Sequence, residues 1–160
     1  MKWGLKTKTR TTLTTFLLGC LLMACSSIEC PVQNTVYTVY ELADTLHDTL
    51  TVTSRRADGI DTTLLNSSVN PTVLNLPISY RNPVDTLVFT TQRLAVTDTV
   101  WVAKDDIPHF ESVDCNASFF HRLTSVSCTY HGIDSIRILH STVDYDPSNA
   151  HIRIRFKARP

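Results

Sequence analysis

Glycine is scarce in this chain, and the glycines present cannot form a phosphate-binding loop. Only four of the 160 residues are glycine, and two of them, Gly4 and Gly19, lie near the N-terminus. Gly59 and Gly132 remain, whereas nucleotide-binding loops need several glycines within a few residues. Enzymes that bind nucleotides through such a loop are therefore excluded.

The short motifs of common catalytic and metal sites are also missing. The chain has no Cys-x-x-Cys pair, no Gly-x-Ser-x-Gly and no Ser-x-x-Lys, which argues against a redox enzyme, a structural zinc site and a serine hydrolase. His109-Phe110-Glu111 matches the first half of a zinc deaminase signature, but the second half, Pro-Cys-x-x-Cys, is absent. We therefore expect no enzyme activity, no cofactor and no regular metal site.

A long apolar run occurs only at the N-terminus. Residues 1–10 carry four basic side chains and no acid, and the run Leu13–Ala24 is shorter than the roughly 20 residues of a membrane-spanning helix. This pattern is typical of a secretory signal peptide. Its last residues, Leu22-Met23-Ala24-Cys25, resemble the bacterial lipoprotein signal, in which the cysteine is lipidated and becomes the mature N-terminus. We predict a signal peptide over residues 1–24 and lipidation of Cys25, with Leu17-Leu18-Gly19-Cys20 as the alternative site.

Cleavage after residue 24 would leave an acidic chain. It removes four of the 15 basic groups and none of the 15 acids, so the net charge becomes −4 (11 − 15). Nucleic acid is therefore not an expected partner, because phosphate backbones bind to cationic surfaces. The one basic cluster, Arg153 to Arg159, alternates with Ile152, Ile154 and Phe156. This alternation predicts a last strand whose solvent side and sheet edge carry cations.

Period-two alternation dominates the rest of the sequence. Around Leu50 and around Phe89, apolar residues alternate with threonines, which predicts strands with one apolar face. No amphipathic helix is evident, because threonine and valine fill the positions where a helix favours alanine, leucine, glutamate or lysine. We predict one all-β domain over residues 35–160, an antiparallel β-sandwich of about eight or nine short strands, with a closed barrel as the alternative. Further stretches of strand composition are Thr35–Tyr40, Phe119–Val126 and Ser135–Ile138.

Turn residues mark the ends of these strands. Asp58-Gly59 predicts a hairpin between the flanking strands, and Pro77 is expected at a strand edge or bulge because it cannot donate to a ladder. Residues 48–65 and 85–102 share Asp-Thr-Leu and a second Asp-Thr at an offset of 37. This repeat suggests two similar hairpins, one in each sheet.

Asp followed by a hydroxyl residue, and usually then by an apolar one, is the most repeated pattern. As a structural pattern it predicts strand entry, with Asp bonded to nearby backbone N–H groups. It also resembles the O-glycosylation acceptor of exported Bacteroidetes proteins, and the two interpretations are compatible. The acceptor hydroxyls would be those of Thr45, Thr49, Thr62, Thr86, Thr99 and Ser135.

Three cysteines, Cys30, Cys115 and Cys128, remain after lipidation of Cys25. In an oxidising compartment, one disulfide and one free thiol is the simplest arrangement. We favour a Cys30–Cys115 disulfide, because Cys128 lies in a predicted strand where a small buried thiol fits. A Cys115–Cys128 disulfide is the alternative.

Two residue sets define rival functional hypotheses. His109, Glu111 and His121 form the densest group of potential acid-base side chains, which would suit a hydrolase. Glycan binding would use aromatic side chains as stacking platforms. It could add an irregular calcium loop at Asp144 and Asp146, which begin like an EF-hand but lack its later glycine and glutamate. The candidate platforms are Trp101, Tyr37, Tyr40 and Tyr130.

Three stretches resemble an uncharacterised family of small Bacteroidetes lipoproteins: Cys30-Pro31-Val32-Gln33-Asn34-Thr35-Val36-Tyr37, His109-Phe110-Glu111-Ser112-Val113-Asp114-Cys115 and Gly132-Ile133-Asp134-Ser135-Ile136. The resemblance covers most of the mature chain and implies an outer-membrane lipoprotein of a Gram-negative host. It transfers no catalytic residue, because the family has no established activity.

The resemblance and the signal together lead to a functional prediction. Only one acid, Glu29, follows Cys25 closely, so the acidic signature of surface export is not evident and we expect the periplasmic face of the outer membrane. Residues 25–34 would form a lipidated tether. We predict a non-enzymatic module that binds an envelope protein or another envelope component, with calcium-assisted carbohydrate binding as the alternative.

Overall fold

The computed structural model describes residues 35–56, 58–112, 115 and 117–158. The chain divides into two compact units, residues 1–30 and 31–160. The first unit lies outside the described residues, and the predicted signal peptide, Cys20, Cys25 and Cys30 lie there with it. The predictions for these residues are therefore not tested.

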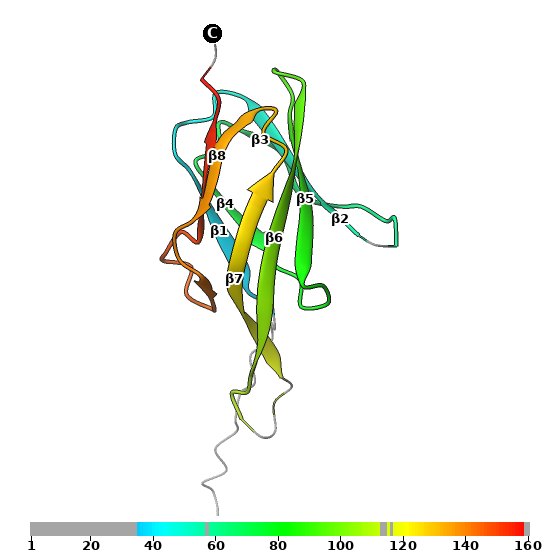
Figure 1. Ribbon diagram of the computed structural model, residues 1–160, viewed down its shortest axis with the longest axis vertical. Helices are drawn as coiled ribbons and strands as arrows, with labels where there is room; N and C mark the ends of the chain where they lie inside the picture. Colours follow the sequence, from blue (N-terminus) through cyan, green and yellow to red (C-terminus); the bar gives the residue numbers. More distant parts are fainter. Residues whose placement is uncertain (1–34, 57, 113–114, 116, 159–160) are drawn as a thin grey trace, which may run out of the picture. The chain divides into compact units, whose positions relative to one another are not determined.

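The described part of the second unit is built from ten β-strands (Figure 1). Within it, no helix is long and apolar enough to cross a membrane. The prediction of an all-β domain is confirmed; the ten strands exceed the eight or nine expected, and one of them, β9, has only two residues. The strands are β1 (Tyr37–Leu42), β2 (Thr49–Arg55), β3 (Thr62–Val69), β4 (Val73–Pro77), β5 (Val84–Thr91), β6 (Val96–His109), β7 (Ser118–Cys128), β8 (Ile133–Ile138), β9 (Thr142–Val143) and β10 (Ile152–Phe156).

The strands form two sheets, as a β-sandwich requires. The four-stranded sheet has the order β4-β1-β10-β8, and the six-stranded sheet has the order β3-β2-β5-β6-β7-β9. Neighbouring strands are antiparallel except β1 and β10, which run parallel with Tyr40 opposite Ile152. The first and last strands of the domain therefore lie side by side in the middle of the smaller sheet.

The core lies between the two sheets and follows the period-two pattern. Leu50 and Val52 of β2 are fully buried, as are Ile152 and Ile154 of β10, and Phe89 of β5 is 1% exposed. The threonines that alternate with them on β2 and β5 are half-buried on the outer side. The alternation thus predicted both the strands and the face that each strand buries.

Two turn predictions are confirmed. Asp58-Gly59 lies in the connection of the β2–β3 hairpin, where Gly59 has a φ of +79° and donates its N–H to the Arg56 carbonyl at 3.1 Å. Glycine adopts this left-handed conformation without a steric penalty. Pro77 ends β4, an edge strand of the four-stranded sheet, where a missing N–H donor leaves no ladder bond unmade.

Two finer predictions about topology are wrong. The last strand, β10, is an inner strand between β1 and β8, so its cations protect no edge. Arg153 instead faces outward and binds Glu41 of β1, which explains the alternation equally well. The two similar hairpins, β2–β3 and β5–β6, lie in the same six-stranded sheet because β2 pairs with β5.

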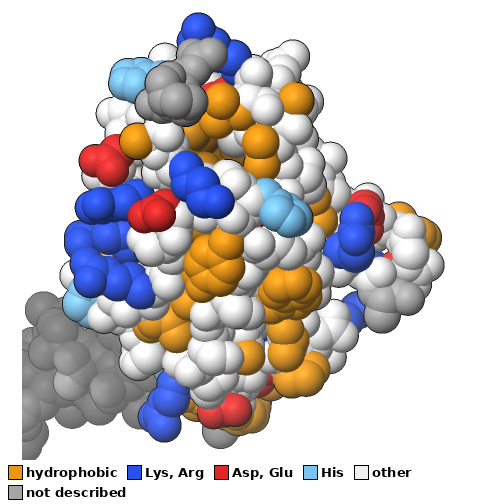
Figure 2. Space-filling view, turned by 45° about the horizontal axis from the view of Figure 1, so that its top comes forward, with side chains coloured by type: hydrophobic (Ala, Val, Ile, Leu, Met, Phe, Trp, Pro, Cys, Tyr) orange, Lys and Arg blue, Asp and Glu red, His pale blue; other side chains and the backbone are white. Residues whose placement is uncertain are grey.

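In Figure 2, Lys and Arg side chains gather on the side where Figure 1 places β8.

Candidate binding site

The predicted acid-base group does not come together. His109 Nε2 lies 3.0 Å from Glu111 Oε1 at a partly exposed position, and the His109 ring stacks on Phe120 with centroids 4.1 Å apart. His121 is the next residue after Phe120 and is buried. Because successive side chains of a strand point to opposite faces, His109 and His121 lie on opposite faces of the sheet. The three side chains therefore cannot act on one substrate atom.

His121 belongs instead to a buried polar network. Its Nδ1 lies 2.7 Å from Asp106 Oδ1, directly across the β6–β7 ladder. Lys104, whose side chain is fully buried, donates its Nζ to the same carboxylate at 3.1 Å and to the Asn82 carbonyl at 2.7 Å. A buried charge is stable only when paired and hydrogen-bonded in this way. Such networks are costly to build and are frequent at functional sites.

Lys104 and Asp106 were not predicted as part of a site, although the strand pattern marks their direction. Both continue the inward-facing row of β6, in which every second residue from Asp98 to Asp106 is buried or half-buried. Charged residues are normally exposed, so Lys104-Asp105-Asp106 looks like an exposed polar stretch. The bulge beside Lys104 leaves this row intact, because its extra residue, Thr124, lies on β7.

Burial determines the protonation of the network. It lowers the pKa of His121, and the hydrogen bond to Asp106 only partly opposes this effect. The Asp106 carboxylate accepts hydrogen bonds, so Nδ1 carries the proton and Nε2 is left as an acceptor. Burial also raises the pKa of Asp85, while the Ser79 N–H at 3.0 Å and the charge of Lys104 oppose the rise.

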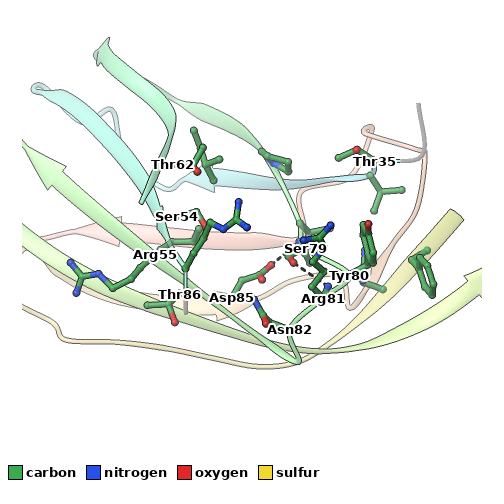
Figure 3. Close-up of a pocket in the computed structure, with 18 of the residues that line it drawn as sticks. Thr35, Ser54, Arg55, Thr62, Ser79, Tyr80, Arg81, Asn82, Asp85 and Thr86 are labelled. Atoms are coloured by element: carbon green, nitrogen blue, oxygen red, sulfur yellow. Dashed lines mark hydrogen bonds between the residues drawn. The ribbon is translucent and has the colours of Figure 1, made fainter. Parts of the chain in front are cut away.

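The network borders an open cavity of about 520 Å³, whose lining includes His121 and Asp85. Figure 3 shows Ser79, Arg81 and Asp85 close together: the Ser79 N–H donates to the Asp85 carboxylate, and the Arg81 N–H donates to the Ser79 hydroxyl. Strands β2 and β3 contribute the hydroxyl groups of Ser54 and Thr62 to the lining, and β5 contributes the Asp85 carboxyl group. The cavity thus offers donors and acceptors from three neighbouring strands of one sheet.

An aromatic pair forms one wall of the cavity. Tyr80 and Phe119 stack with ring centroids 5.3 Å apart and planes 7° from parallel, and both line the cavity. Tyr80 is 54% exposed, and the Arg81 guanidinium carbon lies 5.8 Å from its ring centroid. These contacts hold an exposed aromatic surface in place beside the polar groups. No pattern in the sequence marks either residue as part of a binding site.

Arginines line the cavity near the turn of the β2–β3 hairpin and in the loop after β4. Arg55 lies 3.7 Å from Asp61, and Arg56 lies 3.1 Å from Asp58. Arg81 forms no ion pair within the described part of the chain, although it lines the same cavity. It is therefore the arginine best placed to bind a polar or anionic group of a ligand.

The predicted aromatic platforms lie elsewhere. Tyr40 is 2% exposed and packs against Phe89 in the core, so it is no platform; burial, with a smaller contribution from Asp85, raises its pKa. Trp101 is 38% exposed on the outer face of the six-stranded sheet, between Thr86 and Ser127 of the neighbouring strands. Tyr37 and Tyr130 are exposed, but neither lines the cavity.

The repeated aspartates act over longer distances than predicted. Asp98 is buried and accepts hydrogen bonds from the backbone N–H groups of residues 131, 132 and 133 and from the Thr129 hydroxyl. Asp48 accepts from Thr49 and also from the backbone of residues 93 and 94. In both, burial alone would raise the pKa, but these donors outweigh it and lower the pKa. The motif therefore joins separate strands rather than only its own turn.

The hydroxyls proposed as glycosylation acceptors differ in exposure. Thr45, Thr62 and Ser135 are exposed, whereas Thr49, Thr86 and Thr99 are half-buried. Their modification stays a prediction, and the exposed three are the more accessible acceptors.

Asp144 and Asp146 use their carboxylates to hold their own loop. Asp144 Oδ1 accepts from the Asp146 N–H at 2.8 Å, and Asp146 Oδ1 accepts from the backbone and the hydroxyl of Ser148. The described residues contain no group of three or more His, Cys, Asp or Glu side chains that could hold a metal ion.

Cys128 carries a free thiol buried in β7, as predicted. Burial raises the pKa of this thiol, and its hydrogen bond to the Tyr130 backbone only partly opposes the rise. The Cys30–Cys115 pairing stays a prediction, because Cys30 lies outside the described residues.

Comparison with known proteins gives one match. A family model described as a family of unknown function, DUF6452, matches residues 49–156, from the start of β2 to the end of β10. No curated protein and no solved structure matches the chain. The match covers the buried network and the cavity lining except Thr35 and Val36, but it assigns no activity to them.

Proposed function

The chain belongs to the DUF6452 family, and from this premise we propose that it is a lipid-anchored, non-enzymatic binding module of the cell envelope. The observation that carries the proposal is the open cavity of about 520 Å³ over the Lys104–Asp106–His121 network. Ligand sites are typically concave, within this range of volume, and lined by a few well-placed polar groups. The separation of His109 from His121 supports binding rather than catalysis.

A saccharide is the ligand class that the lining supports best. Sugars present an apolar face that stacks on aromatic rings and hydroxyls that need donors and acceptors. The Tyr80–Phe119 wall supplies the first requirement, and the hydroxyl and charged groups beside it supply the second. A protein partner would need a contact of about 800 Å² on each side, which a cavity of this size does not by itself provide.

The anchor is tested by metabolic labelling with a clickable palmitate analogue, followed by membrane fractionation. We expect label in the outer membrane for the wild type and none for Cys25→Ala. Label that persists in Cys25→Ala and disappears in Cys20→Ala would move the anchor to Cys20. Absence of label in the wild type would contradict the anchor. Protease added to intact cells should not reach the domain if it faces the periplasm.

Ligand binding is tested with a panel of neutral and acidic oligosaccharides from bacterial envelopes, read by isothermal titration. Tyr80→Ala should weaken binding about ten-fold, because stacking and area burial are lost together. Trp101→Ala is the matched control, since it removes an exposed aromatic side chain outside the cavity. Loss of binding in Trp101→Ala alone would move the site to the outer sheet face, and no binding to any saccharide would contradict the ligand class.

A further inference from the structure

A row of charged side chains crosses the outer face of the four-stranded sheet. Tyr40, Ile152 and Ile154 are buried, so the residues that alternate with them point away from the core. The register places Glu41 of β1 opposite Arg153 of β10, and Arg153 opposite Arg137 of β8. Two arginines therefore lie directly side by side on neighbouring strands.

The carboxylates on this face do not balance the arginines. Arg153 binds Glu41 through three contacts of 2.9 to 3.2 Å, and Arg155 lies 3.6 Å from the exposed Asp44. Arg137 is exposed and forms no ion pair with any residue that the structure describes. Like charges directly opposite each other in a sheet are unfavourable, and a bound anion would relieve this cost.

Small residues leave room for a ligand between the guanidinium groups. Arg137, Arg153 and Arg155 line a shallow hollow of about 540 Å³ together with Glu41, Ala43 and Ser135. Ser135 lies opposite Arg155 in the register and contributes an exposed hydroxyl. In Figure 2, basic side chains are concentrated on this side of the molecule, whereas elsewhere on the visible face they are scattered.

We propose that this hollow binds a phosphate group of a ligand. The planar guanidinium fork pairs with phosphate oxygens through two parallel hydrogen bonds, which a lone cation cannot do. Arg137 makes the main contact with the phosphate because no carboxylate competes for its guanidinium group. Arg153 and the Ser135 hydroxyl lie beside it. Three guanidinium groups against two carboxylates leave a net positive charge that a phosphate neutralises. This site is separate from the cavity and does not depend on the function proposed for it.

The test is isothermal titration of the full-length protein in neutral detergent micelles. Two probes distinguish the source of the phosphate: inorganic phosphate, and a short-chain phosphatidylglycerol compared with its phosphatidylcholine counterpart. Binding of inorganic phosphate supports a soluble phosphorylated ligand, and binding of phosphatidylglycerol alone supports a lipid headgroup. We expect Arg137→Gln to weaken binding of either probe about ten-fold and Arg137→Lys to weaken it less, because lysine keeps the charge but loses the fork.

Arg122→Gln is the matched control. Arg122 is also an exposed strand arginine without an ion pair in the described part of the chain, but it lies on β7 in the other sheet. Its variant should bind as tightly as the wild type. The proposal is overturned if neither probe binds, or if Arg122→Gln and Arg137→Gln weaken binding equally. Equal thermal unfolding midpoints for the variants would show that a difference in binding is not a difference in folding.

Discussion

Single buried side chains fix the way in which the two sheets are joined. Asp98 of β6, in the larger sheet, receives four hydrogen bonds from the segment that leads from β7 to β8 in the smaller sheet. His151 acts within the smaller sheet instead: it lies just before β10, and its Nδ1 accepts from the Val39 N–H of the neighbouring strand β1 at 2.9 Å. At both positions a charged or ionisable residue is buried because the backbone supplies its partners.

Replacing Asp98 with asparagine should destabilise the domain by about 3 kcal/mol. The amide keeps one acceptor oxygen but turns an N–H group toward backbone donors, which leaves buried groups unpaired. Asp134→Asn is the matched control, because Asp134 begins the same three-residue pattern but is exposed. Urea unfolding measures both variants. An Asp98→Asn loss no larger than that of Asp134→Asn would contradict the joining role.

His151 should make stability depend on pH. Burial lowers its pKa below the ordinary value of about 6.5, and the charge of Asp144 only partly opposes this. The unfolded chain therefore binds a proton as the pH falls through about 6.5, while the folded protein stays neutral until its lower pKa is reached. This contribution to stability is complete above pH 6.5 and declines as the pH falls, by at most about 1.4 kcal/mol per pH unit.

The check is the free energy of unfolding of wild type and His151→Gln between pH 5 and 7.5. The wild-type slope contains a second contribution of the same sign from His121, whose pKa is also lowered. His151→Gln should therefore reduce the slope without abolishing it. His47→Gln, at an exposed position, serves as the control and should keep the wild-type slope. An unchanged slope in His151→Gln would contradict the assignment.

At the scale of elements, the sequence predicted where the strands lie better than it predicted which strands pair with one another. Alternation around Leu50 and Phe89 is a local property, and burial on one face explains it completely. The place of β10 inside its sheet is a property of pairing with β1, more than 100 residues away, and no local pattern encodes it. The buried network was missed for the same reason: the alternation of β6 places Lys104 and Asp106 on the inward face, but their partner His121 lies on β7, and no local pattern brings it beside them.

Gly132, in the connection from β7 to β8, should tolerate no side chain. A Cβ there would lie 3.0 Å from Val96 Cγ1 and 3.3 Å from Asp98 Oδ2, so it would displace a strand residue and the carboxylate that holds the connection. We expect Gly132→Ala to cost about 2 kcal/mol through overpacking. Gly59→Ala is the comparison, because its Cβ meets nothing within 4 Å and only its positive φ is unfavourable, by about 1 kcal/mol. The reverse order of the two losses in urea unfolding would contradict this account.

For the whole molecule, the fold class followed from the sequence, but the candidate site did not. The β-sandwich needs only strand alternation and turn residues, which are visible along the chain. The cavity depends on side chains from β2, from the loop after β4 and from β7, which only the three-dimensional pairing brings together. Of the residues singled out in advance, His121 belongs to it through Asp106 rather than through the predicted partners His109 and Glu111.

The cysteines give a test that concerns the whole molecule. If Cys25 is lipidated and Cys30 pairs with Cys115, the mature protein has a single thiol, that of Cys128, and its burial in β7 should prevent alkylation of the folded protein. Alkylation followed by mass measurement should then add no label to the native protein, one label after unfolding and three after unfolding with reduction.

Closing a loop of about 85 residues would stabilise the fold by roughly 4 to 5 kcal/mol on the chain-entropy model, so reduction should also lower the unfolding midpoint. Cys128→Ala controls the assignment, because it should remove the single label of the unreduced, unfolded protein and leave two after reduction. Three labels without reduction would contradict the disulfide, and two labels in unreduced, unfolded Cys128→Ala would show that Cys128 belongs to the bridge, because its former partner and the third cysteine would then both be thiols.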